Sequence, residues 1–377
     1  MPISLSADQT RFLRLRAQRL IELPAASAAR VVKDVCGVQA QELAAARLQV
    51  RARSHGLTAA HVDDARLNQR SIVWSWAMRG TLFLLAAEDY AWLQPLLGPV
   101  MIAGERSRMR QLGLDEDTAA KGARLLVDLL ASQGPLTRHE IAERLRPHGI
   151  PVAGQASIHL IAHAAVQGLI IRGPDKDGEP AYVLLSDWIK PGAPLPPRDS
   201  VAELARRYLA AYAPAGPRDF AAWSGLSLTE ARAGFKDIAA ELVELEIAGA
   251  SGSRNDTGTV WMLKSQAAWL DEDWASAHSV RLLPRFDNYL LGYASRELAL
   301  ANQYAKRINA GGGIIHPTLC VDGAIQGKWT TQKERGGLKV MIEPFESLSA
   351  ELHPAIAAEV ADLGRFLGAN TVFQIKE

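Results

Sequence analysis

Apolar and polar positions follow two periods along this chain, and the change from one period to the other occurs three times. Each time, short stretches with apolar residues at helical spacing are followed by two β-rich runs joined by a turn. This order of elements is typical of a winged-helix unit, in which a small group of helices carries a β-hairpin. The pattern therefore predicts an α+β fold with three tandem winged-helix units.

The first unit is predicted to span residues 1–112. Its helices are expected at about 7–20, 26–37 and 42–54, and its hairpin at 72–76 and 81–86, with Met78-Arg79-Gly80 as the turn. Leu13, Ala17 and Leu20 fall at helical spacing and are expected to face a core. That orientation leaves Arg14 toward solvent or phosphate.

The second unit is predicted to span residues 113–190. Its helices are expected near 117–132, 137–147 and 154–167, and its hairpin strands at 169–171 and 181–185. The segment Gly173-Pro174-Asp175-Lys176-Asp177-Gly178 between these strands is rich in turn residues, so it is predicted to form the tip of the wing.

The second half of the chain is predicted to hold a third unit at 198–275 and a different, β-rich module at 276–377. A stiff proline-rich linker, PGAPLPPRD at 191–199, leads into the third unit, whose hairpin strands are expected at 242–247 and 260–264. The last module is expected to contain β-rich runs and a terminal helix, at 313–323, 324–331, 338–345 and 349–367. Winged helices alone do not explain this C-terminal sheet.

Composition excludes several classes of protein. Hydrophobic residues make up 48% and charged residues 22% of the 377 positions, values typical of a folded globular chain. No apolar run has membrane-spanning length, and the N-terminus has no hydrophobic segment behind its arginines, so a cytoplasmic protein without a membrane partner is expected. Cys36 and Cys320 are far apart and have no nearby Cys or His, which indicates neither a disulfide framework nor a zinc site.

Charge is segregated along the chain although the net charge is only +1. Residues 1–60 contain nine basic and four acidic side chains, and residues 281–340 contain the same numbers, so each segment carries +5. Residues 237–276 contain eight acidic and two basic side chains, which gives −6. This distribution favours one phosphate-facing surface and one solvated back, with ordinary surface variation as the alternative.

The motifs of most familiar enzyme classes are missing. No nucleotide-binding glycine loop, metal-ligand cluster, GxSxG elbow or kinase signature occurs, and Gly311-Gly312-Gly313 lacks the lysine of a phosphate loop. We therefore expect no cofactor and no metal. A fold that docks on duplex DNA remains, and from the residues alone a noncatalytic regulator is the default interpretation.

Five motifs in order make the chain resemble the winged-helix AlkZ/YcaQ family of DNA glycosylases. They are GVQAQEL (37–43), RGTLFL (79–84), GPRDFAAWSGL (216–226), LLPRFDNYLLGY (282–293) and VDGAIQGKW (321–329). The resemblance covers essentially the whole chain and implies three winged helices and a C-terminal β-rich module arranged as a C-shaped clamp on DNA. It also implies a catalytic Gln-Φ-Gln motif, which Gln39-Ala40-Gln41 matches.

The chemistry of Gln39 and Gln41 suits an N7-alkylated purine. Such a base is already cationic and leaves without a general acid, so an amide that accepts a hydrogen bond from water and donates another can hold that water against the anomeric carbon. Residues i and i+2 lie on different faces of a helix, so the pair can converge only at a helix terminus or turn. Solvated surface glutamines are the alternative.

The candidate DNA contacts come from two sources. Arg14, Arg51, Arg53 and Arg79 are predicted to contact phosphates, with solvated surface as the alternative for each. Arg307, Gly312 and His316 fall where the resemblance implies a DNA-probing hairpin, although His316 could equally cap a strand end. Asp287, between Arg285 and Tyr289, is interpreted as structural and left out of the catalytic set.

The resulting hypothesis is a monomeric, monofunctional DNA glycosylase. Its expected partner is double-stranded DNA containing N7-alkylated purines, including bulky adducts and interstrand crosslinks, in repair or in resistance to DNA-alkylating agents. Two alternatives stay open. A noncatalytic winged-helix transcriptional regulator would bind an operator, usually as a dimer, and a protein-interaction scaffold would show neither salt-dependent DNA binding nor base release.

Overall fold

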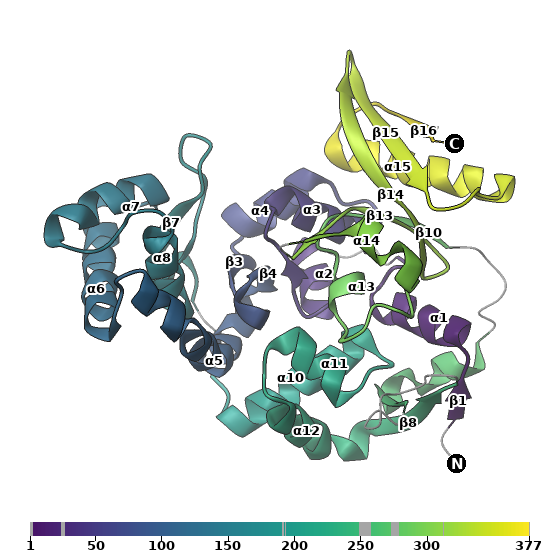
Figure 1. The fold of residues 1–377 in the computed structure, drawn as a ribbon, viewed down its shortest axis with the longest axis horizontal. Coiled ribbons are helices and arrows are strands. Elements are labelled where there is room, and N and C mark those ends of the chain that lie inside the picture. The colour runs from purple at the N-terminus through teal and green to yellow at the C-terminus, as the bar shows by residue number, and fades with distance from the viewer. Residues whose placement is uncertain are drawn as a thin grey trace. The chain divides into compact units, whose positions relative to one another are not determined.

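The computed structural model describes residues 3–23, 27–190, 192, 194–248, 258–272, 279–311 and 313–376 (Figure 1). Internal contacts group the chain into two compact units. The middle unit is Asp63–Ser200, and the discontinuous unit joins Met1–Val62 to Val201–Glu377. This division cuts through the segment 1–112 that the sequence pattern assigns to one winged helix. The four predicted segments, the three winged helices and the clamp remain predictions.

Within the described residues, the middle unit combines six α-helices with a small antiparallel sheet whose strands run in the order β4-β3-β6-β7-β5. Helix α4 leads into it from the discontinuous unit. Its elements are α4 (Ala59–Leu67), β3 (Ile72–Trp76), η1 (Met78–Gly80), β4 (Leu82–Ala86), η2 (Ala87–Asp89), α5 (Tyr90–Gln111), α6 (Glu116–Gln133), β5 (Leu136–Thr137), α7 (Arg138–Leu145), η3 (Arg146–His148), α8 (Ala156–Val166), β6 (Ile170–Arg172), β7 (Ala181–Leu184) and α9 (Leu185–Trp188).

Both predicted hairpins of the middle unit are confirmed. Strands β3 and β4 pair antiparallel from Ile72↔Ala86 to Trp76↔Leu82, and β6 pairs with β7. The tip of the second hairpin has a positive φ at Asp177 (53°) and at Gly178 (83°). Two consecutive residues with positive φ define a tight turn that matches the twist of the flanking strands, which is why an Asp-Gly pair occurs there.

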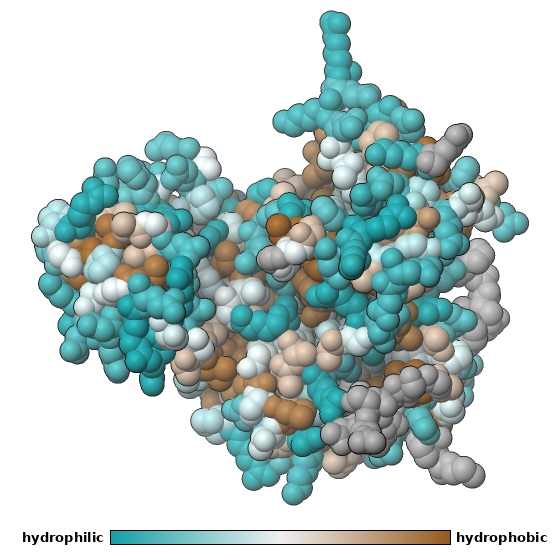
Figure 2. All heavy atoms as spheres, in the orientation of Figure 1, coloured by the Kyte–Doolittle hydropathy of each residue, from teal (hydrophilic) through white to brown (hydrophobic). Residues whose placement is uncertain are grey.

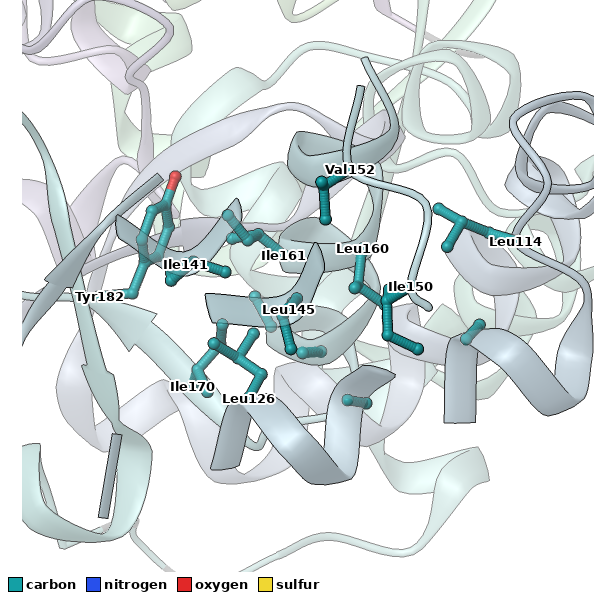
Figure 3. Close-up of a cluster of buried hydrophobic side chains, with 14 of the residues drawn as sticks. Leu114, Leu126, Ile141, Leu145, Ile150, Val152, Leu160, Ile161, Ile170 and Tyr182 are labelled. Carbon is teal, nitrogen blue, oxygen red and sulfur yellow. The ribbon is translucent and has the colours of Figure 1, made fainter. Parts of the chain in front are cut away.

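One continuous apolar core holds the middle unit together (Figure 3). Leu126 on α6, Leu145 on α7 and Leu160 on α8 are completely buried against Ile170 and Tyr182 of the hairpin. Helix α7 begins with a reciprocal cap between Thr137 and Glu140, which satisfies backbone donors at its first turn. Three helices followed by a hairpin are the order of elements predicted for residues 113–190.

The discontinuous unit contains another five-stranded sheet, two smaller sheets and several helices. Its elements are β1 (Ile3–Leu5), α1 (Ala7–Ala17), α2 (Ala28–Asp34), β2 (Val38–Gln39), α3 (Leu43–Ala52), α10 (Pro197–Tyr212), α11 (Pro217–Ser224), α12 (Leu228–Asp237), η4 (Ala239–Glu241), β8 (Leu242–Ile247), β9 (Thr259–Leu263), η5 (Lys264–Asp271), β10 (Val280–Leu283), α13 (Asn288–Leu291), η6 (Asn302–Tyr304), α14 (Ala305–Ile308), β11 (Asn309–Gly311), β12 (Ile314–Ile315), β13 (Thr318–Val321), β14 (Ala324–Glu334), β15 (Gly337–Pro344), η7 (Ala350–Leu352), α15 (His353–Leu367) and β16 (Thr371–Ile375).

The C-terminal sheet has the strand order β10-β13-β14-β15-β16. Helix α15 packs its apolar face on this sheet, where Ile356, Val360 and Leu363 are buried with Trp329 and Ile342. The outer part of the long β14–β15 hairpin is exposed and forms a hydrophilic projection in Figure 2. The β-rich character predicted for 276–377 is therefore confirmed. Within the described residues, no helix combines the length and the apolar composition needed to cross a membrane.

Candidate active site

Gln39 and Gln41 lie in a non-helical segment that connects α2 to α3. Cys36 and Gly37 have positive φ angles (54° and 89°), and after this turn Val38–Gln39 forms the short strand β2. Glu42 is the extended N-cap residue of α3, directly after Gln41. Because i and i+2 side chains diverge in a helix, a non-helical segment at a helix boundary is the geometry that this pair requires. The predicted position of the pair at a helix boundary is confirmed.

The two glutamines differ in their exposure. Gln39 is only 6% exposed, and Ala40 beside it is completely buried. Gln41 is exposed just before the N-terminus of α3, where backbone N–H groups point out of the helix. The pair therefore combines one side chain held in the protein with one that faces solvent.

Two buried amide side chains bind the backbone around Gln39. Oδ1 of Asn288 accepts a hydrogen bond from the backbone N–H of Gln39 (3.2 Å), and Nδ2 of Asn288 donates to the carbonyl of Gly37 (2.7 Å). Nε2 of Gln49 donates to the carbonyl of Gln39 (2.7 Å) and to that of Phe286 (3.4 Å). The backbone of the candidate catalytic segment is thus bound on both of its polar sides.

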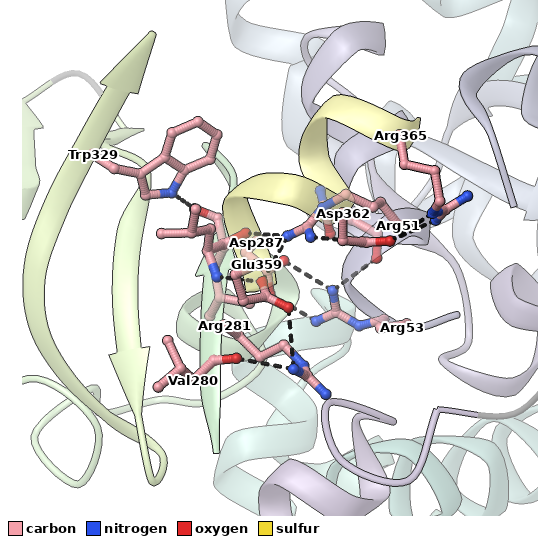
Figure 4. A network of polar contacts seen from close by, with 12 residues as sticks. Arg51, Arg53, Val280, Arg281, Asp287, Trp329, Glu359, Asp362 and Arg365 are labelled. Atoms are coloured by element: carbon pink, nitrogen blue, oxygen red, sulfur yellow. Dashed lines mark hydrogen bonds and ion pairs between the residues drawn. The ribbon is translucent and has the colours of Figure 1, made fainter. Parts of the chain in front are cut away.

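Arg53 and Asp287, which adjoin Gln49 and Asn288, form a buried ion pair (Figure 4). The guanidinium donates to both carboxylate oxygens, at 2.7 and 2.9 Å, and also to Oε1 of Gln18 at 2.9 Å. Burial alone lowers the pKa of Arg53, but the charge and hydrogen bonds of Asp287 outweigh that cost and raise the pKa above its ordinary value. Asp287 also caps α13 by accepting from the backbone N–H of Tyr289, in agreement with its interpretation as a structural residue.

Arg51 forms a second buried network, which connects α3 to the C-terminal sheet (Figure 4). Its guanidinium donates to the carbonyl of Leu282 (2.8 Å) and pairs with Glu359 and Asp362, each at 3.0 Å. Glu359 in turn accepts from the backbone N–H of Leu282 and pairs with Arg281. These contacts attach α3 to β10 and α15.

The structure corrects three of the predicted phosphate contacts. Arg51 and Arg53 are 1% and 0% exposed, and Arg14 is 7% exposed. Arg14 donates from Nε to the carbonyl of Pro214 (3.1 Å) and lies over the ring of Tyr293, 3.7 Å from its centroid. Guanidinium groups withdrawn from solvent and bound internally do not reach a phosphate, so these arginines have structural roles.

Arg285, His316 and Lys328 define a basic cluster. It lies beside the N-terminus of α3, which directly follows Gln41 and Glu42. Arg285 donates to Oε1 of Glu42 at 2.6 Å, and Lys328 pairs with Glu343 at 3.0 Å. Partial burial, followed by the nearby charges of Lys328 and Arg285, lowers the pKa of His316 below its ordinary value. Sequence reasoning singled out His316 but not the other two, whose only signals are the +5 charge of 281–340 and, for Arg285, its place in LLPRFDNYLLGY.

Of the remaining predicted DNA contacts, Arg307 and Arg79 are half-buried. Arg307, on α14, is half-buried, donates to the carbonyl of Pro344 (3.3 Å) and lies over the ring of Phe345. The strands β11 and β12 that follow α14 form the predicted hairpin, but Gly312, between them in the sequence, lies outside the described residues. Arg79 is half-buried in the β3–β4 turn of the middle unit and has a positive φ of 58°.

The motif LLPRFDNYLLGY packs beside the segment that carries the glutamines and holds it by hydrogen bonds. Asn288 binds that segment, and the hydroxyl of Tyr289 donates to the carbonyl of Gly323 (2.7 Å). A Cβ on Gly292 would lie 2.4 Å from the ring of Tyr212, so only glycine fits there without a shift. The sequence flagged this motif by resemblance; its physical role is visible only in the folded chain.

The described residues contain no group of three or more His, Cys, Asp or Glu side chains arranged to hold a metal ion. Cys36 and Cys320 are both buried. Burial raises the pKa of Cys320 to about 12, which suppresses the reactive thiolate form. Neither cysteine resembles a nucleophile.

Comparison with known proteins agrees with the motifs. A family model described as DNA glycosylase AlkZ-like matches residues 32–366. An interstrand DNA cross-link repair glycosylase from Streptomyces sahachiroi is 28% identical in an alignment that covers 95% of this chain and 95% of that protein. The solved structure of Streptomyces sahachiroi DNA glycosylase AlkZ has 25% identity and a TM-score of 0.83, covering 99% of this chain and 100% of that chain.

These matches confirm both the α+β fold and the resemblance seen in the sequence. The family match extends over most of the chain and includes residues 37–43 and 282–293, which meet at the candidate site. The chain therefore belongs to the AlkZ-like DNA glycosylase family.

Proposed function

We propose that the protein is a monofunctional DNA glycosylase that hydrolyses the N-glycosidic bond of N7-alkylated purines in duplex DNA. The proposed substrates include bulky adducts and interstrand crosslinks, and the role is repair or self-resistance to DNA-alkylating agents. Family membership supports the reaction class, and the name of the Streptomyces sahachiroi relative supports crosslinks as substrates. The noncatalytic regulator is not favoured by these matches.

One observation carries the proposal. Gln39 and Gln41 lie in a non-helical segment, the backbone of Gln39 is hydrogen-bonded by buried amide side chains, and Gln41 is exposed. An amide oxygen accepts a hydrogen bond from water and the NH₂ group donates one, so the pair can hold a water molecule against the anomeric carbon. Glycosidases that act on neutral sugars use two carboxylates. A cationic leaving base relaxes that requirement.

DNA binding is assigned to the surface around this pair. The basic cluster supplies cationic groups next to the N-terminus of α3, where the helix dipole also favours a phosphate. Arg307 before the β11–β12 hairpin, His316 after it and Gly312, which lies between the two strands in the sequence, are proposed to enter a groove. Arg79 is proposed as a phosphate contact from the middle unit. Glu42 pairs with Arg285, so a phosphate that binds Arg285 competes with that carboxylate.

The test is release of free base from a duplex that contains 7-methylguanine. Purified protein is incubated with this duplex and with an undamaged duplex, and alkaline cleavage then reveals abasic sites. Cleavage of the modified strand only, with no product trapped by borohydride, is the expected result, because hydrolysis by water forms no Schiff base. Salt-dependent DNA binding without base release would instead favour the regulator.

A crosslinked duplex extends the same assay to the proposed physiological substrate. Unhooking is detected as conversion of the crosslinked species into separable strands under denaturing conditions. We expect the protein to act as a monomer, which light scattering at working concentration can check. An enzyme that releases 7-methylguanine but leaves crosslinks intact would narrow the proposal to monoadducts.

A further inference from the structure

We infer that Gln49 and Asn288 are positioning residues, whose side-chain amides hold the backbone of Gln39 in the geometry needed for base release. The inference rests on the proposed function, because positioning has meaning only if Gln39 acts on the substrate. Neither residue was singled out by the sequence pattern.

The two amides form a closed set of hydrogen bonds with the segment. Asn288 binds the N–H of Gln39 and the carbonyl of Gly37, while Gln49 binds the carbonyl of Gln39. The two residues are also joined to each other, since Oε1 of the Gln49 side chain accepts from the backbone N–H of Asn288 at 3.3 Å. Gln49 is completely buried and Asn288 is 2% exposed, so water does not compete for these bonds.

An amide is the side chain that this arrangement requires. It offers a donor and an acceptor on one planar group, whereas a carboxylate only accepts and an aliphatic side chain does neither. Asn288 uses both functions on the same segment, one on each side of Val38. Loss of either function leaves a buried backbone group without its partner, which is unfavourable.

The positioning extends inward to a rigid support. Asp287, adjacent to Asn288, is fixed by the bidentate ion pair with Arg53 and caps α13. Gln49 is one turn before Arg53 on α3, and its carbonyl accepts from the Arg53 guanidinium at 3.2 Å. Both positioning residues are therefore tied to the same buried ion pair. The backbone of Gln39 is therefore held by residues that are themselves fixed in position. This matters for the rate, because misplacement of a catalytic group can slow a reaction about 10²-fold.

Gln266 provides a matched control in the same unit. It is 5% exposed, and its Oε1 accepts from the backbone N–H of Leu263 (3.1 Å) while its Nε2 donates to the carbonyl of Ala210 (3.0 Å). Gln266 thus holds backbone with the same chemistry as Gln49, but its partners Leu263, Leu209 and Ala210 lie outside the segment of Gln39. Comparison of the two separates positioning from general stabilisation.

The experiment compares Gln49→Glu, Asn288→Asp and Gln266→Glu. Each change keeps the shape and the acceptor oxygens but removes the NH₂ donors. Single-turnover release of 7-methylguanine is measured at saturating enzyme, with DNA affinity and melting temperature recorded for every variant, at a temperature where circular dichroism matches the wild type. We expect about a 10- to 100-fold slower rate for the first two variants. The control should stay within about twofold, and DNA affinity should be unchanged in all three.

A double-mutant comparison gives the decisive readout. In the Gln39→Ala background, Gln49→Glu should slow the reaction little further, because groups that act as a unit share one contribution. Full additivity, or equal rates for Gln49→Glu and Gln266→Glu, would overturn the positioning role. If Gln49→Glu does not fold, Asn288→Asp decides the question, since it removes only the bond to the carbonyl of Gly37.

Failure of this inference and failure of the proposed function give different results. If the wild-type protein releases no base, the glycosylase assignment itself is wrong. If the wild type releases base and Gln39→Ala slows it, while the Gln49 and Asn288 variants behave like Gln266→Glu, only the positioning role is wrong.

Discussion

The two ends of helix α3 use polar residues in opposite ways. At its start, Gln41 and Glu42 are exposed at the surface. At its end, Arg51 and Arg53 are completely buried, although arginine is the residue type most often associated with DNA contacts. Residue type alone therefore does not reveal which polar groups serve the substrate and which serve the fold.

The energetic reason lies in desolvation. A guanidinium taken out of water loses several kcal/mol of hydration, so it is tolerated only with well-placed partners. Arg53 has Asp287, and Arg51 has Glu359 and Asp362. At the other end, Gln41 stays in water and has no such cost. We propose that the C-terminal end of α3 serves the stability of the fold and that the residues before its N-terminus serve base release, and this division can be tested.

The largest expected effect is loss of stability when the buried ion pair is broken. Arg53→Met leaves Asp287 buried without its partner, and we expect a decrease of about 3–5 kcal/mol in the free energy of unfolding. Urea denaturation followed by circular dichroism measures it. Arg30→Met, which removes a surface arginine paired with Asp34, should leave the urea midpoint nearly unchanged. Equal midpoints for both variants would contradict the division.

The next effect is on rate at the other end of the helix. Gln39→Ala and Gln41→Ala should each slow single-turnover release of 7-methylguanine by about 10²-fold. Gln41→Ala should keep the wild-type melting temperature, because its side chain is exposed, whereas Gln39→Ala should lower it modestly.

The double variant at Gln39 and Gln41 should be close to the slower single variant, because both amides are proposed to hold one water molecule. Gln41→Asp is expected to retain activity on cationic lesions, because a carboxylate also accepts a hydrogen bond from water. A double variant with the wild-type rate would remove both residues from the mechanism.

A smaller effect is expected on DNA affinity from the basic cluster. Lys328→Ala should weaken binding to any duplex and reduce the slope of log affinity against log salt by about one, as for loss of one phosphate contact. Lys236→Ala, which removes an exposed lysine on α12, is the control and should leave the slope unchanged. The same slope for both variants would place the DNA-facing surface elsewhere.

His316 should contribute a modest pH dependence. Burial and the charges of Lys328 and Arg285 lower its pKa, so the imidazole is neutral at pH 7 in the free protein. A phosphate nearby favours the protonated form, so DNA affinity should rise as the pH falls below about 6.5. The rise should be absent in His316→Gln. Identical pH profiles for this variant and the wild type would exclude a contact from His316.

No change at all is expected on chelation. The proposed mechanism uses amides and water. EDTA should therefore change neither the free energy of unfolding nor the rate of base release. Loss of activity with EDTA, restored by zinc or magnesium, would overturn the scheme of water held by Gln39 and Gln41.

Local elements were predictable because their signals are local. Strand 72–76 and the Asp-Gly wing tip follow from alternation and turn chemistry within a few residues. Helix α5 was missed, because Pro95 and Pro99 interrupt its pattern in the sequence while packing preserves the helix. The parallel pairing of β1 with β8 was missed too, since about 240 residues separate these strands and no local pattern reports such a contact.

For the site, the sequence by itself determined the Gln39-Ala40-Gln41 motif and its place at a helix boundary, since capping and turn preferences depend on near neighbours. Only the tertiary structure decided that Arg51 and Arg53 are buried and that Asn288 and Gln49 hold Gln39. Asp287 is 234 positions from Arg53, and Asn288 is 249 positions from Gln39. Burial and pairing depend on which distant segments meet, and the charge or polarity of a residue does not encode that.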